Sequence, residues 1–110
     1  MRGRSIVAAM FLATSPASAQ DTVMTSGTLL DACTRANESW ISFCNGFFQA
    51  IHDVGALDGR VCIPEGTTRT ELVVAFERQA VEILAASPSL ASTAAVSFAA
   101  LTLEAEFPCS

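Results

Sequence analysis

The chain has 110 residues and a formal net charge of −5 at pH 7. A chain of this length forms one domain with a modest core. Its acidic balance argues against nucleic acid and anionic membrane surfaces as partners, because both select basic patches, whereas a basic protein partner is compatible with it.

The first segment, Met1–Ala19, has the three parts of a secretory signal peptide. Arg2 and Arg4 form a basic start, residues 6–13 are apolar, and Ala17-Ser18-Ala19 is an A-x-A cleavage site. The apolar run is too short to span a bilayer. We therefore expect cleavage after Ala19 and a mature domain of residues 20–110 in the periplasm, without membrane insertion. Loss of the two arginines leaves four basic residues against 11 acidic ones, a net charge of −7.

Hydrophobic periodicity in the mature chain predicts helices and no strand. The first expected helix covers residues 27–34, after Thr25 or Ser26 as a possible N-cap. The second covers residues 39–54 and ends at Gly55, because glycine is common just past a helix end.

The second helix has the clearest amphipathic pattern in the chain. Its apolar residues recur at spacings of three and four, which predicts a buried face made of Trp40, Phe43, Cys44, Phe47, Ile51 and Val54. Phe48 lies outside this stripe, so it either widens the buried face or is exposed. Gly46 is tolerable inside the helix if another helix crosses closely there.

A capping-box motif marks the start of a third helix. Thr68-Arg69-Thr70-Glu71 fits the S/T-x-x-E pattern and predicts a helix over residues 69–86. Ser87-Pro88 ends that helix, and the proline suits the first position of a fourth helix over residues 88–107. The chain is thus predicted to be all-α, a small bundle of about four helices.

The cysteines are even in number and all lie in the mature part: Cys33, Cys44, Cys62 and Cys109. In a small exported domain this pattern indicates two disulfides. The chain contains no Cys-x-x-Cys pair and only one histidine, so we expect no zinc site and no other metal.

Helix geometry favours one pairing of these cysteines. The short turn at Ser87-Pro88 predicts that the third and fourth helices form an antiparallel pair, which would bring Cys109 beside Cys62. Cys33–Cys44 is then the complementary bridge. Cys44–Cys62 remains an alternative, because the 57–61 loop could run back along the second helix.

No group of residues assembles an active site. His52 and Asp53 are adjacent on a helix and point about 100° apart, so we expect that they do not orient one another as a catalytic triad requires. Glu104 and Glu106 are two apart on a helix, and the glycines lack phosphate-loop spacing. We therefore expect neither an enzyme nor a cofactor site.

The order of these features resembles the Rap1a/Tai family of type VI secretion immunity proteins. The similarity covers nearly all of the mature chain, and the matching segments are Gly27–Cys33 (GTLLDAC), Cys44–Asp53 (CNGFFQAIHD), Cys62–Leu72 (CIPEGTTRTEL), the Ser87-Pro88 turn and Ala100–Cys109 (ALTLEAEFPC).

The resemblance implies a periplasmic all-α protein, often a homodimer, that binds a peptidoglycan-cleaving amidase effector and blocks its active site. Contact residues vary between cognate pairs of such proteins. We place the partner contact on the 55–60 loop, at Gly55, Leu57, Asp58 and Arg60, with an ordinary solvated connection as the alternative.

Two other functions remain open from the sequence. A periplasmic stress chaperone similar to HdeA is also small, helical and disulfide-containing, and it would expose apolar surface in acid. An orphan binding or scaffold protein without any effector is the third hypothesis, because a fold does not guarantee a function.

Overall fold

The computed structural model describes residues 23–110. The predicted signal peptide, Met1–Ala19, lies outside this range. Within it the chain forms α2 (Ser26–Cys33), α3 (Glu38–Asp58), α4 (Arg69–Ala86), the short 3-10 helix η3 (Pro88–Ser92) and α5 (Ala95–Glu106). Strand pairing among these residues is limited to one isolated bridge, Thr25 to Ala94. The prediction of an all-α fold is confirmed.

The helix starts follow local side-chain chemistry. Asn37 caps α3 by accepting hydrogen bonds from the backbone N–H groups of Ser39 and Trp40. At the start of α4 the predicted capping box is confirmed: Thr68 Oγ1 accepts from the Glu71 N–H at 3.1 Å, and Glu71 Oε1 accepts from the Thr68 N–H at 2.8 Å. The predicted bounds of this helix, 69–86, are confirmed as well.

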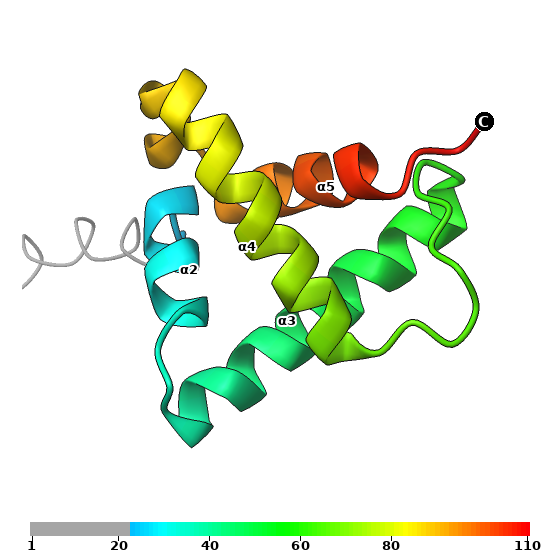
Figure 1. The fold of residues 1–110 in the computed structure, drawn as a ribbon, viewed down its shortest axis with the longest axis horizontal. Helices are drawn as coiled ribbons and strands as arrows, with labels where there is room; N and C mark the ends of the chain where they lie inside the picture. Colours follow the sequence, from blue (N-terminus) through cyan, green and yellow to red (C-terminus); the bar gives the residue numbers. More distant parts are fainter. Residues whose placement is uncertain (1–22) are drawn as a thin grey trace, which may run out of the picture.

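The core lies where α4 crosses α3 and meets α5 (Figure 1). Three phenylalanines form its centre, one from each helix. The ring centroids of Phe48 and Phe76 are 4.8 Å apart, and those of Phe76 and Phe98 are 6.2 Å apart. All three side chains are buried. Burial of each such ring stabilises the fold by roughly 1.5–3 kcal/mol.

The predicted buried face of α3 is partly wrong. Phe48, left outside the stripe, is fully buried, whereas Phe43 and Val54, placed in the stripe, are 37% and 53% exposed. The reason is that α4 packs over Phe48, so the contact is set by where the crossing helix lies. The residues of α3 that the structure buries are Cys44, Phe48, Ile51 and Gly55.

The predicted end of α3 is also wrong. The helix continues past Gly55 to Asp58, and Gly59 caps it with φ 71°, a left-handed conformation that glycine adopts without strain. Gly55 instead serves close packing, because a Cβ built there would lie 2.8 Å from Val61 Cγ2. No helix crosses closely at Gly46 within the described residues, since a Cβ built there would meet no atom within 4 Å.

The predicted fourth helix is interrupted at Thr93 and Ala94. Both residues have extended backbone geometry, between η3 and α5. The extended segment pairs with the start of the described chain: the Ser26 N–H donates to the Thr93 carbonyl oxygen, and the Ala95 N–H donates to the Met24 carbonyl oxygen, each at 2.9 Å. These tertiary hydrogen bonds replace the helical ones that a continuous helix would make.

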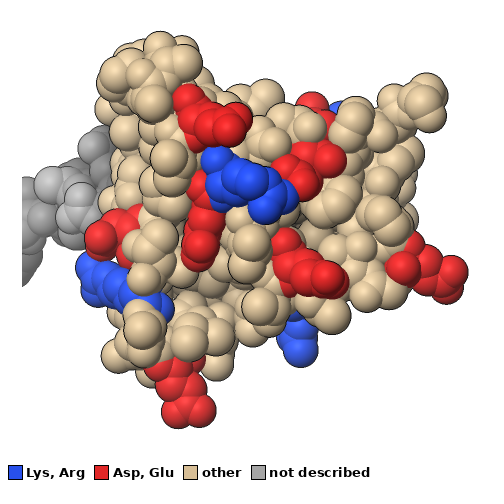
Figure 2. Space-filling model, in the orientation of Figure 1, with Lys and Arg blue, Asp and Glu red and all other residues tan. Residues whose placement is uncertain are grey.

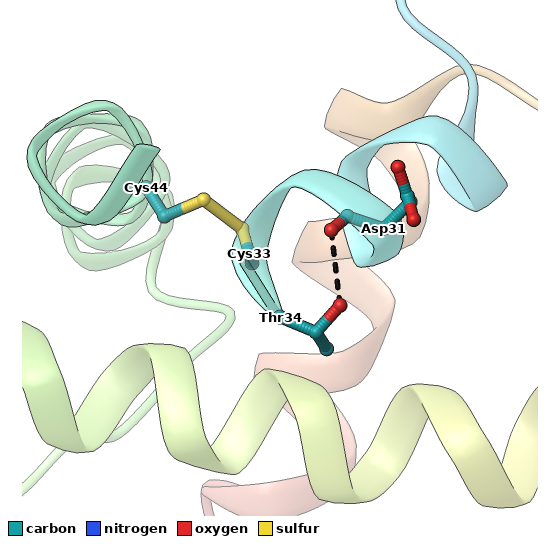
Figure 3. The surroundings of a disulfide bond; sticks show 4 residues. All are labelled: Asp31, Cys33, Thr34 and Cys44. Atoms are coloured by element: carbon teal, nitrogen blue, oxygen red, sulfur yellow. Dashed lines mark hydrogen bonds between the residues drawn. A yellow bond between two sulfur atoms is a disulfide. The ribbon is translucent and has the colours of Figure 1, made fainter. Parts of the chain in front are cut away.

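The structure contains the disulfides Cys33–Cys44 and Cys62–Cys109, and the described residues include no free cysteine. Cys33–Cys44 joins the end of α2 to α3 and is nearly buried (Figure 3). These are the pairs favoured from the sequence, and Cys44–Cys62 is not formed.

The route to the second pair differs from the predicted antiparallel helices. Figure 1 shows α5 crossing α4 and running toward the C-terminal end of α3. Cys62 lies just after α3, where its N–H donates to the Phe107 carbonyl oxygen at 3.0 Å. The bridge therefore fastens the chain terminus to the end of α3, and residues 63–68 lead back to the start of α4.

Candidate partner-binding surface

Three of the four predicted contact residues, Gly55, Leu57 and Asp58, form the last turn of α3, and Arg60 lies in the connection just after the Gly59 cap. Leu57 is the most exposed large hydrophobic residue among those described, at 87%. Asp58 and Arg60 form an ion pair, with 3.2 Å between Oδ2 and Nη2. Gly55 has no side chain, and its backbone is buried against Val61, so it offers no surface for a partner.

Two of these residues, Gly55 and Arg60, line a groove between the C-terminal part of α3 and the outer face of α5. We call it the α3–α5 groove; it has a volume of about 360 Å³, within the range of about 300–1,000 Å³ usual for binding pockets. Its lining is Ile51, Val54, Gly55, Arg60 and Val61 on one side and Val96, Ser97, Ala100, Leu101 and Glu104 on the other. Leu57 and Asp58 are not part of that lining.

The groove exposes three aliphatic side chains, of which Val54 was predicted to lie on the buried face of its helix. Val54, Val96 and Leu101 are 53%, 59% and 43% exposed. The sequence alone could not show that these side chains are exposed, because a helix face that a neighbouring helix covers has the same apolar residues. Clustered exposed apolar residues mark binding surfaces more often than single ones do.

The charges at the groove are few and differently placed. Arg60 is held by Asp58. Glu104 is partly exposed on α5 and forms no ion pair or side-chain hydrogen bond with any residue between 23 and 110. The groove thus combines an apolar floor with one carboxylate that has no ion-pair partner in the part of the chain that the structure describes. Elsewhere too the surface is acidic: on the face in Figure 2, red acidic side chains are more widespread than blue basic ones.

Two smaller hollows flank α4. One, of about 210 Å³, lies beside the Cys33–Cys44 bridge and includes Glu77, whose burial raises the pKa of its carboxyl. The other, of about 320 Å³, contains the ion pair between Arg78 and Glu106. Hydrogen bonds from Gln79 and from Arg78 lower the pKa of the Glu106 carboxyl.

The expectation that His52 and Asp53 cannot orient one another is wrong, because their side chains are in contact. His52 Nδ1 and Asp53 Oδ1 are 3.0 Å apart, and Gln49 Nε2 donates to the same oxygen at 3.0 Å. The hydrogen bonds from His52 and from Gln49 lower the pKa of the Asp53 carboxyl. Within the described part of the chain, no serine, threonine or cysteine is hydrogen-bonded to His52.

Residues 23–110 hold no group of three or more His, Cys, Asp or Glu side chains that could ligate a metal ion. The helices in that range are also too short or too polar for a membrane span.

The helices and the two disulfides define the class of protein, which is a small all-α domain held by two disulfides. The family model of Rap1a immunity proteins matches residues 25–109, which include all the described helices and all four cysteines. The chain belongs to the Rap1a immunity protein family. Its role is accordingly that of an immunity protein, whose partner is an effector protein. No curated protein and no solved structure matches the chain.

Proposed function

We propose that the protein acts in the periplasm, where it binds and inhibits a peptidoglycan amidase effector of a type VI secretion system. Membership in the Rap1a family carries this proposal. On this view the protein is a stoichiometric inhibitor and not an enzyme, and it needs a complementary surface rather than catalytic groups of its own.

The disulfides and the N-terminal sequence support the location. Disulfides persist in oxidising compartments. Cys33–Cys44 joins α2 to α3, and Cys62–Cys109 joins the segment after α3 to the C-terminal segment. Met1–Ala19 has the signal-peptide pattern, so we propose export, cleavage after Ala19 and a mature domain of residues 20–110. We also propose a homodimer, on the basis of the family resemblance alone.

The test is capture and inhibition of a hydrolase. The oxidised protein, purified after expression of the full chain, is mixed with exported cysteine hydrolases encoded near its gene. We expect a stable complex and loss of amide-bond cleavage in peptidoglycan. Sedimentation of the free protein reports whether it is a dimer.

The alternatives give different outcomes in the same preparation. A chaperone of the HdeA type would bind the dye ANS at acidic pH and suppress aggregation of unfolded clients, without inhibiting any hydrolase. An orphan scaffold would do neither. Failure to capture or inhibit any exported hydrolase would contradict the immunity proposal.

A further inference from the structure

The α3–α5 groove has the chemistry of a site for one kind of peptide segment. Its exposed aliphatic residues Val54, Val96 and Leu101 offer apolar contact that no described part of this chain covers. Burying apolar surface of a partner there removes both surfaces from water, which favours association. The volume of about 360 Å³ suits a few side chains rather than a whole domain face.

Charge complementarity selects among apolar occupants. Arg60 is already paired with Asp58, whereas Glu104 has no ion-pair partner among residues 23–110, so this part of the groove presents an uncompensated negative charge. The whole chain is acidic as well, with a net charge of −5. A cationic side chain of a partner is attracted both by Glu104 and by the net negative charge of the chain. A second copy of this acidic chain would instead be repelled by like charge.

The spacing of residues along α5 determines how far the partner's cation lies from its apolar side chain. Leu101 and Glu104 are three residues apart, which is about 4.5 Å along a helix. A partner that seats an apolar side chain against Leu101 and Val96 can reach Glu104 with a lysine or arginine close by in its own sequence.

We propose that the α3–α5 groove binds a segment of the partner protein that presents an aliphatic or aromatic side chain next to a lysine or arginine, with Glu104 accepting the cation. This inference deepens the proposed function and rests on it for the identity of the partner as the effector. It also moves the contact from the Asp58–Arg60 pair to the outer face of α5.

The direct test needs no knowledge of the effector. A library of random short peptides displayed on phage is selected on the immobilised, oxidised protein, and the binding of enriched peptides is measured by fluorescence anisotropy. We expect enriched sequences to combine an apolar side chain with a nearby lysine or arginine. Absence of enrichment, or enrichment of peptides without a cation, would overturn the proposal.

Two matched variants locate the binding. Val96→Asp places a charge on the groove wall, and Val81→Asp places the same charge on α4, away from the three hollows; the two valines are 59% and 60% exposed. We expect Val96→Asp to weaken peptide binding at least about 30-fold, as loss of a central contact does, and Val81→Asp to leave it unchanged. Equal binding by the two variants would contradict the groove as the site.

The carboxylate has its own test. Glu104→Gln keeps the shape and removes the charge, so we expect binding to fall about 5- to 10-fold for peptides that carry the cation. Alanine in place of the peptide's cation should weaken binding to the wild type but not to Glu104→Gln. If the two changes weaken binding independently, Glu104 and the peptide's cation do not pair.

The remaining outcomes separate this inference from the proposed function. If Val96→Asp still captures an amidase as well as the wild type does, the groove is wrong and immunity stands. If the wild type captures no amidase but selects the expected peptides, immunity is wrong and the groove stands. If Val96→Asp turns a dimer into a monomer in sedimentation, a second copy occupies the groove and the inference is wrong.

Discussion

Single residues decide how closely the end of α3 packs. Val61, just after the helix, lies very near Gly55. A side chain at position 55 would have to displace Val61, because a Cβ built on Gly55 is 2.8 Å from Val61 Cγ2. Val61 is buried and β-branched, so it moves with difficulty. Gly46, in the same helix, faces open space. The two glycines therefore have different roles in one helix.

Alanine at these two positions should have opposite effects. We expect Gly55→Ala to lower the free energy of unfolding by about 1–3 kcal/mol through overpacking. Gly46→Ala should raise it by about 0.5–1 kcal/mol, because alanine favours the helix and meets no neighbour. Urea unfolding of each variant measures both changes. An equal gain at both positions would show that Val61 yields without cost.

The capping box predicts a second residue effect. Thr68→Ala removes the acceptor for the Glu71 N–H and should lower the free energy of unfolding by about 1 kcal/mol. Thr70→Ala is the control, since Thr70 is exposed and donates or accepts no side-chain hydrogen bond within residues 23–110. Thermal unfolding compares the two, and a smaller loss at Thr68 than at Thr70 would contradict the assigned cap.

Between helices, α4 and the end of α5 are joined by polar contacts at the surface. Glu106 pairs with Arg78 and accepts a hydrogen bond from Gln79 Nε2 at 2.9 Å. On the other side of α4, Glu77 is partly buried and has no ion-pair partner among the described residues. The surroundings of Glu106 therefore favour its charged form, whereas the burial of Glu77 disfavours its charged form.

Their pH dependences should have opposite signs. The lowered pKa of Glu106 means that its contribution is present above the ordinary value of 4.5 and is lost as the pH falls through the lowered pKa. Glu106→Gln should therefore be less stable than the wild type at neutral pH, with the difference vanishing in acid. Urea unfolding at several pH values measures this. A difference that persists in acid would mean that Glu106 acts through packing and not through its charge.

Burial raises the pKa of Glu77, so its charged form carries a cost at pH values above that raised pKa, and the cost is relieved as the pH falls. Glu77→Gln should then be more stable than the wild type at neutral pH and no more stable in acid. The same unfolding series tests it, and a loss of stability at neutral pH would contradict the assigned cause.

Across the whole molecule, the two disulfides differ in accessibility. Cys44 is 1% exposed and Cys33 9%, whereas Cys62 and Cys109 are both exposed. The first bridge is enclosed by the helices and the second lies on the surface. In the chain-entropy model, their loops stabilise the fold by about 3 kcal/mol for Cys33–Cys44 and about 4 kcal/mol for Cys62–Cys109.

Mild reduction should therefore open the bridges in order. We expect Cys62 and Cys109 to be alkylated first, because a thiolate must reach the sulfur that it attacks. Mass mapping of alkylated peptides after brief treatment with a reductant identifies the freed thiols. Alkylation of Cys33 and Cys44 first would show that the fold opens before the surface bridge breaks.

Much of the fold could be predicted because its signals are local. The capping box of α4 is complete within four residues, so no distant contact is needed to place that helix start. The candidate site was predicted less well. Arg60 does line the α3–α5 groove, but Val96, Leu101 and Glu104 were not predicted as site residues, because nothing in the α5 sequence shows which of its faces stays uncovered.

By itself the sequence determined the all-α class, the capped start of α4, an even set of four cysteines and the acidic charge, all of which depend on residue type and near neighbours. Only the tertiary structure decided which face of α3 is buried, where the last predicted helix breaks and which valines line the groove. The physical reason is that burial and backbone hydrogen bonds between distant segments depend on which segments meet in space. Phe48 under α4 and Thr93 beside Ser26 are examples.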